Sequence, residues 1–251
     1  MILDDILELG KLELKDRKIK DAIIGLSIIA IQLDNGDIGS SYTLREELDG
    51  CCTIFPNDFQ IIGMDAVEVA QWAVTEKNIL KKALGFAALS AGCRNHYHHL
   101  QKIENVDYLA QVKETDVVGM IGYIGPIITA LAGKTKDFII FDKGKQNRCG
   151  VLSQDLQVNL LPTCDVVFIS GTSFINNTID ELLKLCTKAR EVVVIGSSTL
   201  VYPEAYQNYP VSIIAGSLWK KESKEDIFKV ISLAGGIRNL SRYMDKISIR
   251  V

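Results

Sequence analysis

The 251-residue chain lacks several features that would assign it to a protein class at once. It has only five prolines and no repeated or low-complexity segment, which excludes collagen-like and largely disordered proteins. Lys and Arg number 28 against 31 Asp and Glu, so the net charge is −3 and the basic surplus of a general nucleic-acid binder is missing. We therefore expect an ordered globular protein with no nucleic-acid partner.

Signals for secretion and for a membrane span are also missing. Asp4 and Asp5 interrupt the first apolar residues, and no basic segment precedes them. The most apolar stretch, 22–33, is too short to cross a bilayer. The six cysteines form no C-x-x-C pair, so the sequence favours reduced, mostly buried thiols over a zinc ribbon or a disulfide framework. We expect a cytoplasmic protein with no membrane partner.

The first hundred residues have an α+β pattern. Hydrophobic spacing predicts three helices, over 2–15, 65–74 and 78–91. An apolar run over 21–33 is followed by Asn35-Gly36 and by a return strand over 38–44, which predicts a β-hairpin. The polar residues 95–105 are typical of a linker.

After this linker, short apolar strands alternate with helical stretches. The predicted strands cover 117–121, 138–141, 166–169, 192–195 and 212–215. Near-continuous apolar runs are typical of parallel strands that are covered on both faces. The pattern therefore predicts an α/β fold with a doubly wound, mostly parallel, Rossmann-like sheet. We place a smaller α+β domain at residues 1–105 and the Rossmann-like domain at residues 106–251.

Small and polar residues follow each of these predicted strands, at the edge where open α/β sheets bind their ligands. Glycines let a backbone approach a ligand, hydroxyls supply hydrogen bonds, and Asp142 is the candidate charged ligand of a metal ion. For Thr172 a turn hydroxyl, and for Asn176 a helix cap, explain the residue equally well. The candidate ligand-binding residues are Gly122, Tyr123, Gly125, Asp142, Thr172, Asn176, Ser197 and Ser198.

The loop after the first of these strands partly matches the dinucleotide-binding fingerprint. Gly122 and Gly125 occupy the last two glycine positions of G-x-G-x-x-G, but Met120 stands at the first. Asp142 follows about twenty residues later, where a ribose-binding acid is found in such sites. An enzyme using NAD or S-adenosylmethionine is therefore an alternative. Glycines that only close tight turns explain the loop equally well.

All three histidines, His96, His98 and His99, lie in one short segment. Imidazoles suit zinc, copper and nickel, so this cluster is an alternative metal site. Adjacent His98 and His99 would point apart on a helix or strand, and their spacing matches no standard ligand motif. The segment is explained more simply as a solvated part of the linker.

Several segments after successive strands together resemble a known family. They read Gly-Tyr-Ile-Gly-Pro at 122–126, Ser-Gly-Thr-Ser-Phe-Ile-Asn-Asn-Thr at 170–178, Gly-Ser-Ser-Thr-Leu-Val-Tyr-Pro at 196–203 and Ala-Gly-Ser at 215–217. Leu-Gly-Phe-Ala-Ala-Leu-Ser-Ala at 84–91 resembles a helix of the same family. The order and spacing of these segments are similar to those of the "putative heavy-metal-chelation" family, whose domains have no established activity.

The resemblance implies two domains, the first similar to the N-terminal domain of enolase and the second Rossmann-like, with a site in the cleft between them. Asp142 stands where the family often has Glu, and Ser90 stands where Asn is usual. The likeness to enolase concerns the fold and does not carry enolase chemistry.

These observations lead to one functional hypothesis with two competitors. We expect the chain to bind a metal ion, a metal chelate or a small polar ligand in the cleft between its domains, with a divalent or heavy metal ion as the candidate cofactor. The competitors are the nucleotide-cofactor enzyme and a structural module without a ligand site. Catalytic turnover and assembly into a homo-oligomer are compatible with the sequence, which specifies neither.

Overall fold

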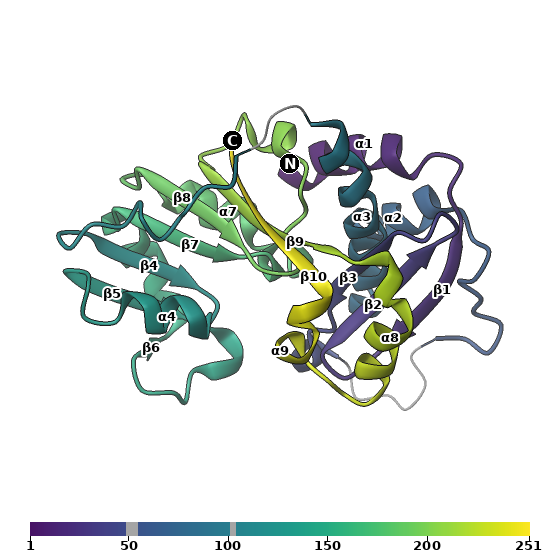
Figure 1. Cartoon of the computed structure of the whole chain (residues 1–251). Coiled ribbons are helices and arrows are strands. Elements are labelled where there is room, and N and C mark those ends of the chain that lie inside the picture. The colour runs from purple at the N-terminus through teal and green to yellow at the C-terminus, as the bar shows by residue number, and fades with distance from the viewer. Residues whose placement is uncertain (49–54, 101–103) are drawn as a thin grey trace.

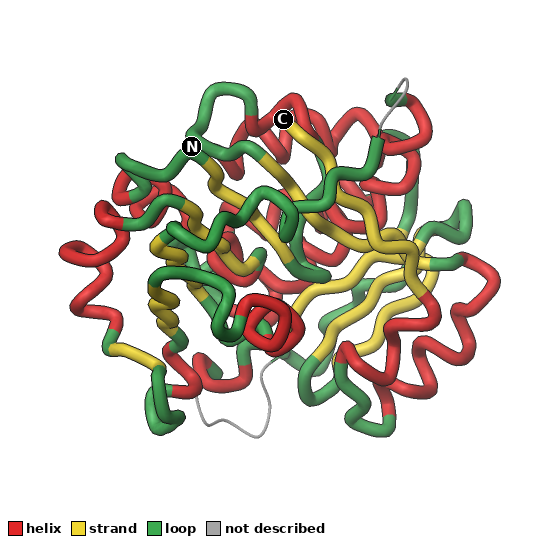
Figure 2. The backbone as a smooth tube through the Cα atoms, turned by 60° about the vertical axis from the view of Figure 1, so that its left-hand side comes forward, coloured by secondary structure: helices red, strands yellow, loops and turns green. Residues whose placement is uncertain are grey.

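The computed structural model describes residues 1–48, 55–100 and 104–251. These residues form a three-stranded antiparallel sheet near the N-terminus and a seven-stranded, mostly parallel sheet (Figure 1). Both chain termini lie at the same end of the molecule, at the top in Figure 1 and Figure 2.

The small sheet has strand order β1-β2-β3 and packs against the long helix α3, on which α1 and α2 also pack. Its elements are α1 (Ile2–Leu14), β1 (Ile19–Ile24), β2 (Ile28–Leu33), β3 (Ile38–Tyr42), α2 (Ala66–Thr75) and α3 (Ile79–His99). The three predicted helices and the hairpin at Asn35-Gly36 are confirmed, because β2 and β3 pair antiparallel and Gly36 has a φ of 88°.

The sequence suggested one strand over the apolar run 21–33, but the structure divides this run between two strands. It holds the end of β1 and all of β2, and the chain reverses between them at residues 25–27. Glycine at position 25 makes room for α8 beside this turn, since a Cβ there would lie 2.6 Å from Cγ2 of Ile231. The tertiary contact that selects glycine comes from a helix two hundred residues away, so local spacing did not reveal it.

The large sheet has strand order β10-β9-β8-β7-β4-β5-β6, with every neighbouring pair parallel except β10 and β9. This is the order of a doubly wound, Rossmann-like sheet with an antiparallel strand added at one edge. Its strands are β4 (Val117–Ile121), β5 (Asp137–Phe141), β6 (Val151–Leu152), β7 (Val166–Ser170), β8 (Glu191–Ile195), β9 (Ile213–Trp219) and β10 (Met244–Arg250). The five predicted strands are confirmed. The two edge strands, β6 and β10, lack a long apolar run and were not predicted.

Side chains on the two faces of this sheet belong to different cores. Val118, Met120 and Phe168 pack with α4, and Val167 and Ile169 pack in the core that includes α7 and the N-terminal helices. The remaining helices are α4 (Gly125–Leu131), α5 (Gln157–Leu160), α6 (Thr172–Ile175), α7 (Ile179–Leu185), α8 (Lys224–Ser232) and α9 (Ile237–Leu240). Among the helices of the described residues, none combines the length and apolar character needed to cross a bilayer.

Helix α8 packs on the small sheet although it belongs to the C-terminal part of the chain (Figure 1). Its residues Ile227 and Ile231 share a core with Ile28, Ala30 and Ile38 of β2 and β3. The domain boundary at residues 105/106 therefore stays a prediction, because α8 of the C-terminal segment packs on the N-terminal sheet.

The segment 95–105 is not wholly a linker, because α3 continues through His99. His96 is buried on α3, and its two ring nitrogens lie 3.0 Å from Glu13 Oε1 and 2.8 Å from Glu204 Oε2. The polar residues of this last helical stretch are thus stabilised by carboxylates from α1 and from the loop after β8, which the local sequence cannot reveal.

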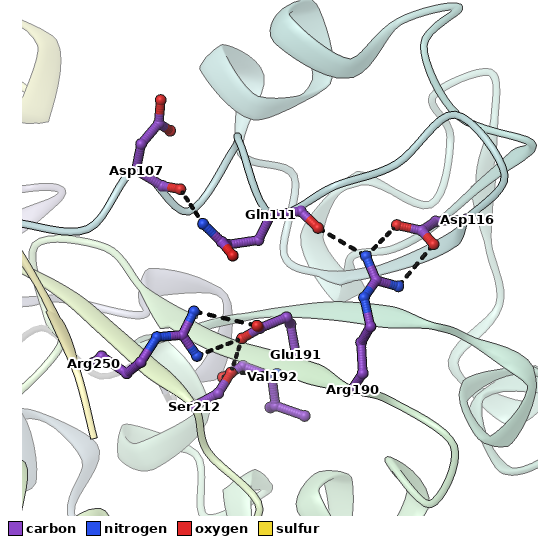
Figure 3. A network of polar contacts seen from close by, with 8 residues as sticks. All are labelled: Asp107, Gln111, Asp116, Arg190, Glu191, Val192, Ser212 and Arg250. Carbon is purple, nitrogen blue, oxygen red and sulfur yellow. Dashed lines mark hydrogen bonds and ion pairs between the residues drawn. The ribbon is translucent and has the colours of Figure 1, made fainter.

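A network of ion pairs closes the edge of the large sheet at the amino-terminal ends of its parallel strands (Figure 3). The Arg190 guanidinium donates to both oxygens of the buried Asp116 carboxylate at 2.7 and 2.6 Å. Arg250 of β10 pairs with Glu191 of β8 at 3.2 Å. This network ties the strands together at the edge opposite the candidate site.

Candidate functional site

The candidate site lies at the carboxyl ends of the parallel strands. From β4 the chain proceeds to β5 on one side of the sheet and later to β7 on the other. Connections that leave in opposite directions open a crevice beyond the strand ends, which is where doubly wound sheets bind ligands. The loops after β4, β5 and β7 carry most of the residues predicted from the sequence.

The loop after β4 is held by two hydrogen bonds that its backbone N–H groups donate. The Gly122 N–H donates to the Phe141 carbonyl at 2.7 Å, and the Tyr123 N–H donates to Asp142 Oδ2 at 2.6 Å. Lys145 Nζ lies 3.8 Å from the same carboxylate oxygen and 5.0 Å from the centre of the Tyr123 ring. Asp142 therefore positions Tyr123, and Lys145 offsets part of the negative charge of Asp142.

Gly122 is required by both its conformation and its surroundings. Its φ is 91°, and a Cβ there would lie 2.8 Å from the Cβ of Ser170 at the end of β7. We expect Gly122→Ala to lower the free energy of unfolding by about 1–2 kcal/mol, because the side chain would add both conformational strain and overlap. Equilibrium unfolding in urea measures the change.

Gly125→Ala is the matched control for this prediction. A Cβ on Gly125 would meet only Arg238 Nη2, at the ordinary contact distance of 3.6 Å. We expect the stability of this variant to lie within about 0.5 kcal/mol of the parent. Equal losses for the two variants would show that the Gly122 turn is not constrained as described.

The loop after β7 brings Thr172 near the β4 loop. Thr172 Oγ1 lies 2.9 Å from Ser170 Oγ, and Ser170 in turn packs against Gly122. Asn176 ends α6, where its N–H donates to the Thr172 carbonyl at 3.3 Å and its side-chain oxygen accepts a hydrogen bond from Thr178 Oγ1 at 2.8 Å. Gly122, Tyr123, Asp142 and Thr172 thus lie around the crevice, whereas the Asn176 amide binds its own loop.

Ser197 and Ser198 connect the large sheet to the small one. Both are buried, and Ser198 Oγ accepts a hydrogen bond from the Tyr42 N–H at 3.2 Å. Burial raises the pKa of the Tyr42 hydroxyl, and a hydrogen bond with Ser197 opposes that rise. These contacts give the two serines a structural role at the end of β3.

Lys82 and Glu47, which the sequence did not single out, meet this edge from the N-terminal part of the chain. The buried Lys82 Nζ on α3 donates to Asn177 Oδ1 at 2.8 Å. Burial lowers the pKa of Lys82, while the nearby Glu47 carboxylate acts to raise it. Glu47 also pairs with Lys143 Nζ at 3.2 Å. Charged groups from both parts of the chain therefore meet beside the Asp142 loop.

A cavity that is open to solvent, with a volume of about 550 Å³, adjoins the β4 loop between α4 and α9. Its lining residues are Tyr123, Gly125, Pro126, Ile128, Thr129, Ala130, Arg148 and Arg238. Tyr123 and Gly125 were predicted from the sequence. Arg148 comes from the loop between β5 and β6, and Arg238 comes from α9, so only the fold brings them together.

His96 and His99 approach the same oxygen of Glu13, whereas His98 does not join them. His96 is buried between Glu13 and Glu204, and His99 Nδ1 lies 3.5 Å from Glu13 Oε1. His98 is exposed and lies edge-on to the Tyr97 ring. Within residues 1–48, 55–100 and 104–251, no three His, Cys, Asp or Glu side chains form a group able to hold a metal ion.

The described thiols differ sharply in accessibility. Burial raises the pKa of Cys93 and of Cys186 to about 12 and that of Cys164 to about 11, whereas Cys149 is exposed. Because the thiolate is the reactive form, we expect iodoacetamide at pH 8 to alkylate Cys149 and to leave the three buried thiols unmodified. Cys51 and Cys52 lie outside the described residues.

Peptide mass spectrometry reads out this labelling. The same reaction in 6 M guanidinium is the control, and there all four described cysteines should react. Rapid alkylation of Cys93 in the native protein would contradict the buried environment described here.

The strand order, the crevice and the adjoining cavity define a doubly wound α/β protein with a pocket at the carboxyl ends of its strands. A family model for DUF364, described as "Putative heavy-metal chelation", matches residues 104–250. A second model with the same description, DUF4213, matches residues 8–92. The first match covers more than half of the chain, which therefore belongs to the DUF364 family.

Solved structures of this family share the fold. A DUF364 protein of unknown function from Pyrococcus horikoshii has a TM-score of 0.85 at 22% identity, with 100% of each chain covered. Another, from Desulfitobacterium hafniense, has a TM-score of 0.79 at 19% identity, with 99% of each chain covered. An uncharacterized protein of Methanocaldococcus jannaschii is 28% identical over 145 residues, 56% of this chain. The match spans about half, 55%, of that relative's length.

Proposed function

We propose that this protein binds a small polar ligand that carries a metal ion, in the cavity beside the β4 loop. The observation that carries the proposal is the position of Tyr123, whose side chain lines the 550 Å³ cavity and whose N–H is fixed by Asp142. Tyr123 therefore connects Asp142, the predicted metal-binding carboxylate, with a space for a small molecule. The heavy-metal-chelation description of the family supports the same reading.

The Asp142 carboxylate has the chemistry that this role needs. Oδ2 accepts the Tyr123 N–H and lies near Lys145, while Oδ1 accepts no hydrogen bond from the described residues. A carboxylate oxygen is a suitable ligand for zinc and for harder divalent ions. The chelating ligand would supply the other donor atoms. The hydroxyls of Ser170 and Thr172 lie 2.9 Å from each other, and Ser170 packs against Gly122 of the β4 loop.

Thermal unfolding with zinc citrate and nickel citrate tests the proposal. A ligand at 100 times its Kd stabilises the folded state by about 2.7 kcal/mol. For a chain of this size, that stabilisation raises Tm by about 5–10 °C. We expect such a rise for the parent protein and its loss in Asp142→Ala, with each variant compared with its own ligand-free Tm.

The double variant His98→Ala/His99→Ala is the control, because both side chains are exposed. It should keep the full rise in Tm. If the rise persists in Asp142→Ala and disappears in the histidine variant, the metal binds at the histidines and the proposal fails.

A nucleotide-type cofactor is the second candidate, and the crevice between β4 and β7 is the observation in its favour. Asp142 would then contact a ribose hydroxyl. NAD and S-adenosylmethionine belong in the same thermal measurement. A rise with either of them, and none with the metal citrates, would replace the chelate proposal by this one.

A further inference from the structure

Two arginines line the cavity, and neither has a carboxylate partner among the described residues. The Arg148 guanidinium lies over the Tyr123 ring, with Cζ 4.8 Å from the ring centre. Arg238 Nη2 lies 3.6 Å from the point that a Cβ on Gly125 would occupy. Both residues are exposed, and neither forms an ion pair with any of the described residues. Positive charge thus gathers in the cavity from two distant segments.

The other groups around the cavity do not cancel this charge. Among the described residues its lining contains no Asp or Glu, and the Asp142 carboxylate that holds the Tyr123 N–H already has Lys145 at 3.8 Å. Two guanidinium groups that line one cavity both attract an anion that enters it. Each guanidinium presents a planar fork of donors that matches the oxygens of a carboxylate or phosphate.

We propose that Arg148 and Arg238 form an oxyanion-binding site for a carboxylate or phosphate group of the ligand. This inference rests on the proposed function for the identity of the pocket, and it adds the sign of the ligand's charge. A metal ion then reaches the site as an anionic chelate, with Arg148 and Arg238 on the acidic groups of the chelator. The apolar lining from Pro126, Ile128 and Ala130 accommodates the rest of a small molecule.

Metal-free titrations with citrate and with pyrophosphate test this inference. Isothermal titration calorimetry is carried out on protein freed of metal by a chelating resin, at an ionic strength kept constant with KCl. We expect the parent protein to bind at least one of the two anions. The double variant Arg148→Gln/Arg238→Gln should bind that anion at least tenfold more weakly, because it loses the charged hydrogen bonds. The citrate and pyrophosphate arms distinguish a carboxylate ligand from a phosphate ligand.

Arg242→Gln is the matched control. Arg242 also lies over a tyrosine ring, with Cζ 4.7 Å from the centre of Tyr243, but it is not part of the cavity lining. Its substitution removes one of the two positive charges that the double variant removes, and it should leave anion affinity within about twofold of the parent. If neither anion binds the parent, or if the double variant binds as tightly as Arg242→Gln, the inference is wrong.

The two proposals fail in different ways. The anion titration contains no metal, and the metal test depends on Asp142 rather than on the arginines. A rise in Tm with metal citrate that Asp142→Ala abolishes, together with no binding of free anions, would keep the proposed function and overturn the oxyanion site. Binding of a free anion that needs both arginines, without a rise in Tm from the metal, would keep the oxyanion site and overturn the proposed function.

Discussion

Gly39→Ala should lower the free energy of unfolding by about 3 kcal/mol, at the upper end of what overpacking costs. Gly39 lies in β3 where this strand crosses α3, and a Cβ there would lie 2.0 Å from the Ala87 carbonyl oxygen and 2.1 Å from the Ala91 nitrogen. Both atoms belong to the backbone of α3, so no side-chain rotation can make room. The strand and the helix would have to move apart. Guanidinium unfolding followed by circular dichroism measures the loss.

Gly144→Ala is the control for this prediction. Gly144 is exposed, and a Cβ there would have its nearest neighbours, in Asp142 and Glu46, at 3.6 Å or more. We expect a change below about 0.5 kcal/mol. A loss below 1 kcal/mol in Gly39→Ala would mean that β3 and α3 are farther apart than described.

Arg190→Ala should cost about 2–3 kcal/mol at pH 7. The change removes two hydrogen bonds and the cationic partner from the buried Asp116 carboxylate, and leaves the Lys113 N–H as its donor (Figure 3). Breaking a fully buried pair costs about 3–5 kcal/mol, and the lower value applies here because 35% of the Arg190 side chain is exposed. Urea unfolding at a series of pH values measures the effect.

The pH dependence of this loss follows from Asp116. Burial acts to raise the pKa of Asp116, but the hydrogen bonds from Arg190 and from the Lys113 N–H hold it below the usual 3.8. A carboxyl whose folded pKa is lowered stabilises the protein fully above its unfolded pKa and loses that contribution as the pH falls through the folded value. The difference between parent and variant should therefore be constant from pH 7 to about 5 and shrink below about pH 4.

Lys188→Ala provides the contrast, because in its ion pair with Asp165 at 2.9 Å the lysine side chain is 56% exposed and the aspartate 25%. Removing this pair should cost less than about 1 kcal/mol. If the two variants lost equal stability, or if the Arg190 effect grew below pH 4, the assignment of Asp116 as a buried, paired carboxylate would be contradicted.

The sequence predicted the fold where local pattern and tertiary structure agree. Continuous apolar runs identified β4, β5, β7, β8 and β9, and Asn35-Gly36 identified the turn between β2 and β3. Prediction failed where a distant contact decides the local structure. Ile231 of α8 leaves no room for a side chain at Gly25, in the turn between β1 and β2. Glu13 of α1 contacts the His96 ring near the end of α3.

The candidate site divides in the same way. The rule that ligands bind beyond the carboxyl ends of parallel strands pointed to Gly122, Tyr123 and Asp142, and the fold places these three residues together. Arg148 and Arg238 could not be predicted, because they lie 90 residues apart in exposed segments without a periodic pattern. Ser198 was selected for its hydroxyl, and the fold shows that this hydroxyl accepts a hydrogen bond from the Tyr42 N–H of β3.

The central claim is that a metal ion enters the cavity beside Asp142 as part of an anionic chelate. Diffraction from crystals soaked in zinc citrate, with data collected above the zinc absorption edge, locates the metal by its anomalous signal. We expect a zinc peak about 2.0–2.2 Å from an Asp142 oxygen, with citrate carboxylates bound to Arg148 and Arg238. A zinc peak between His96 and His99, with no citrate in the cavity, would contradict it.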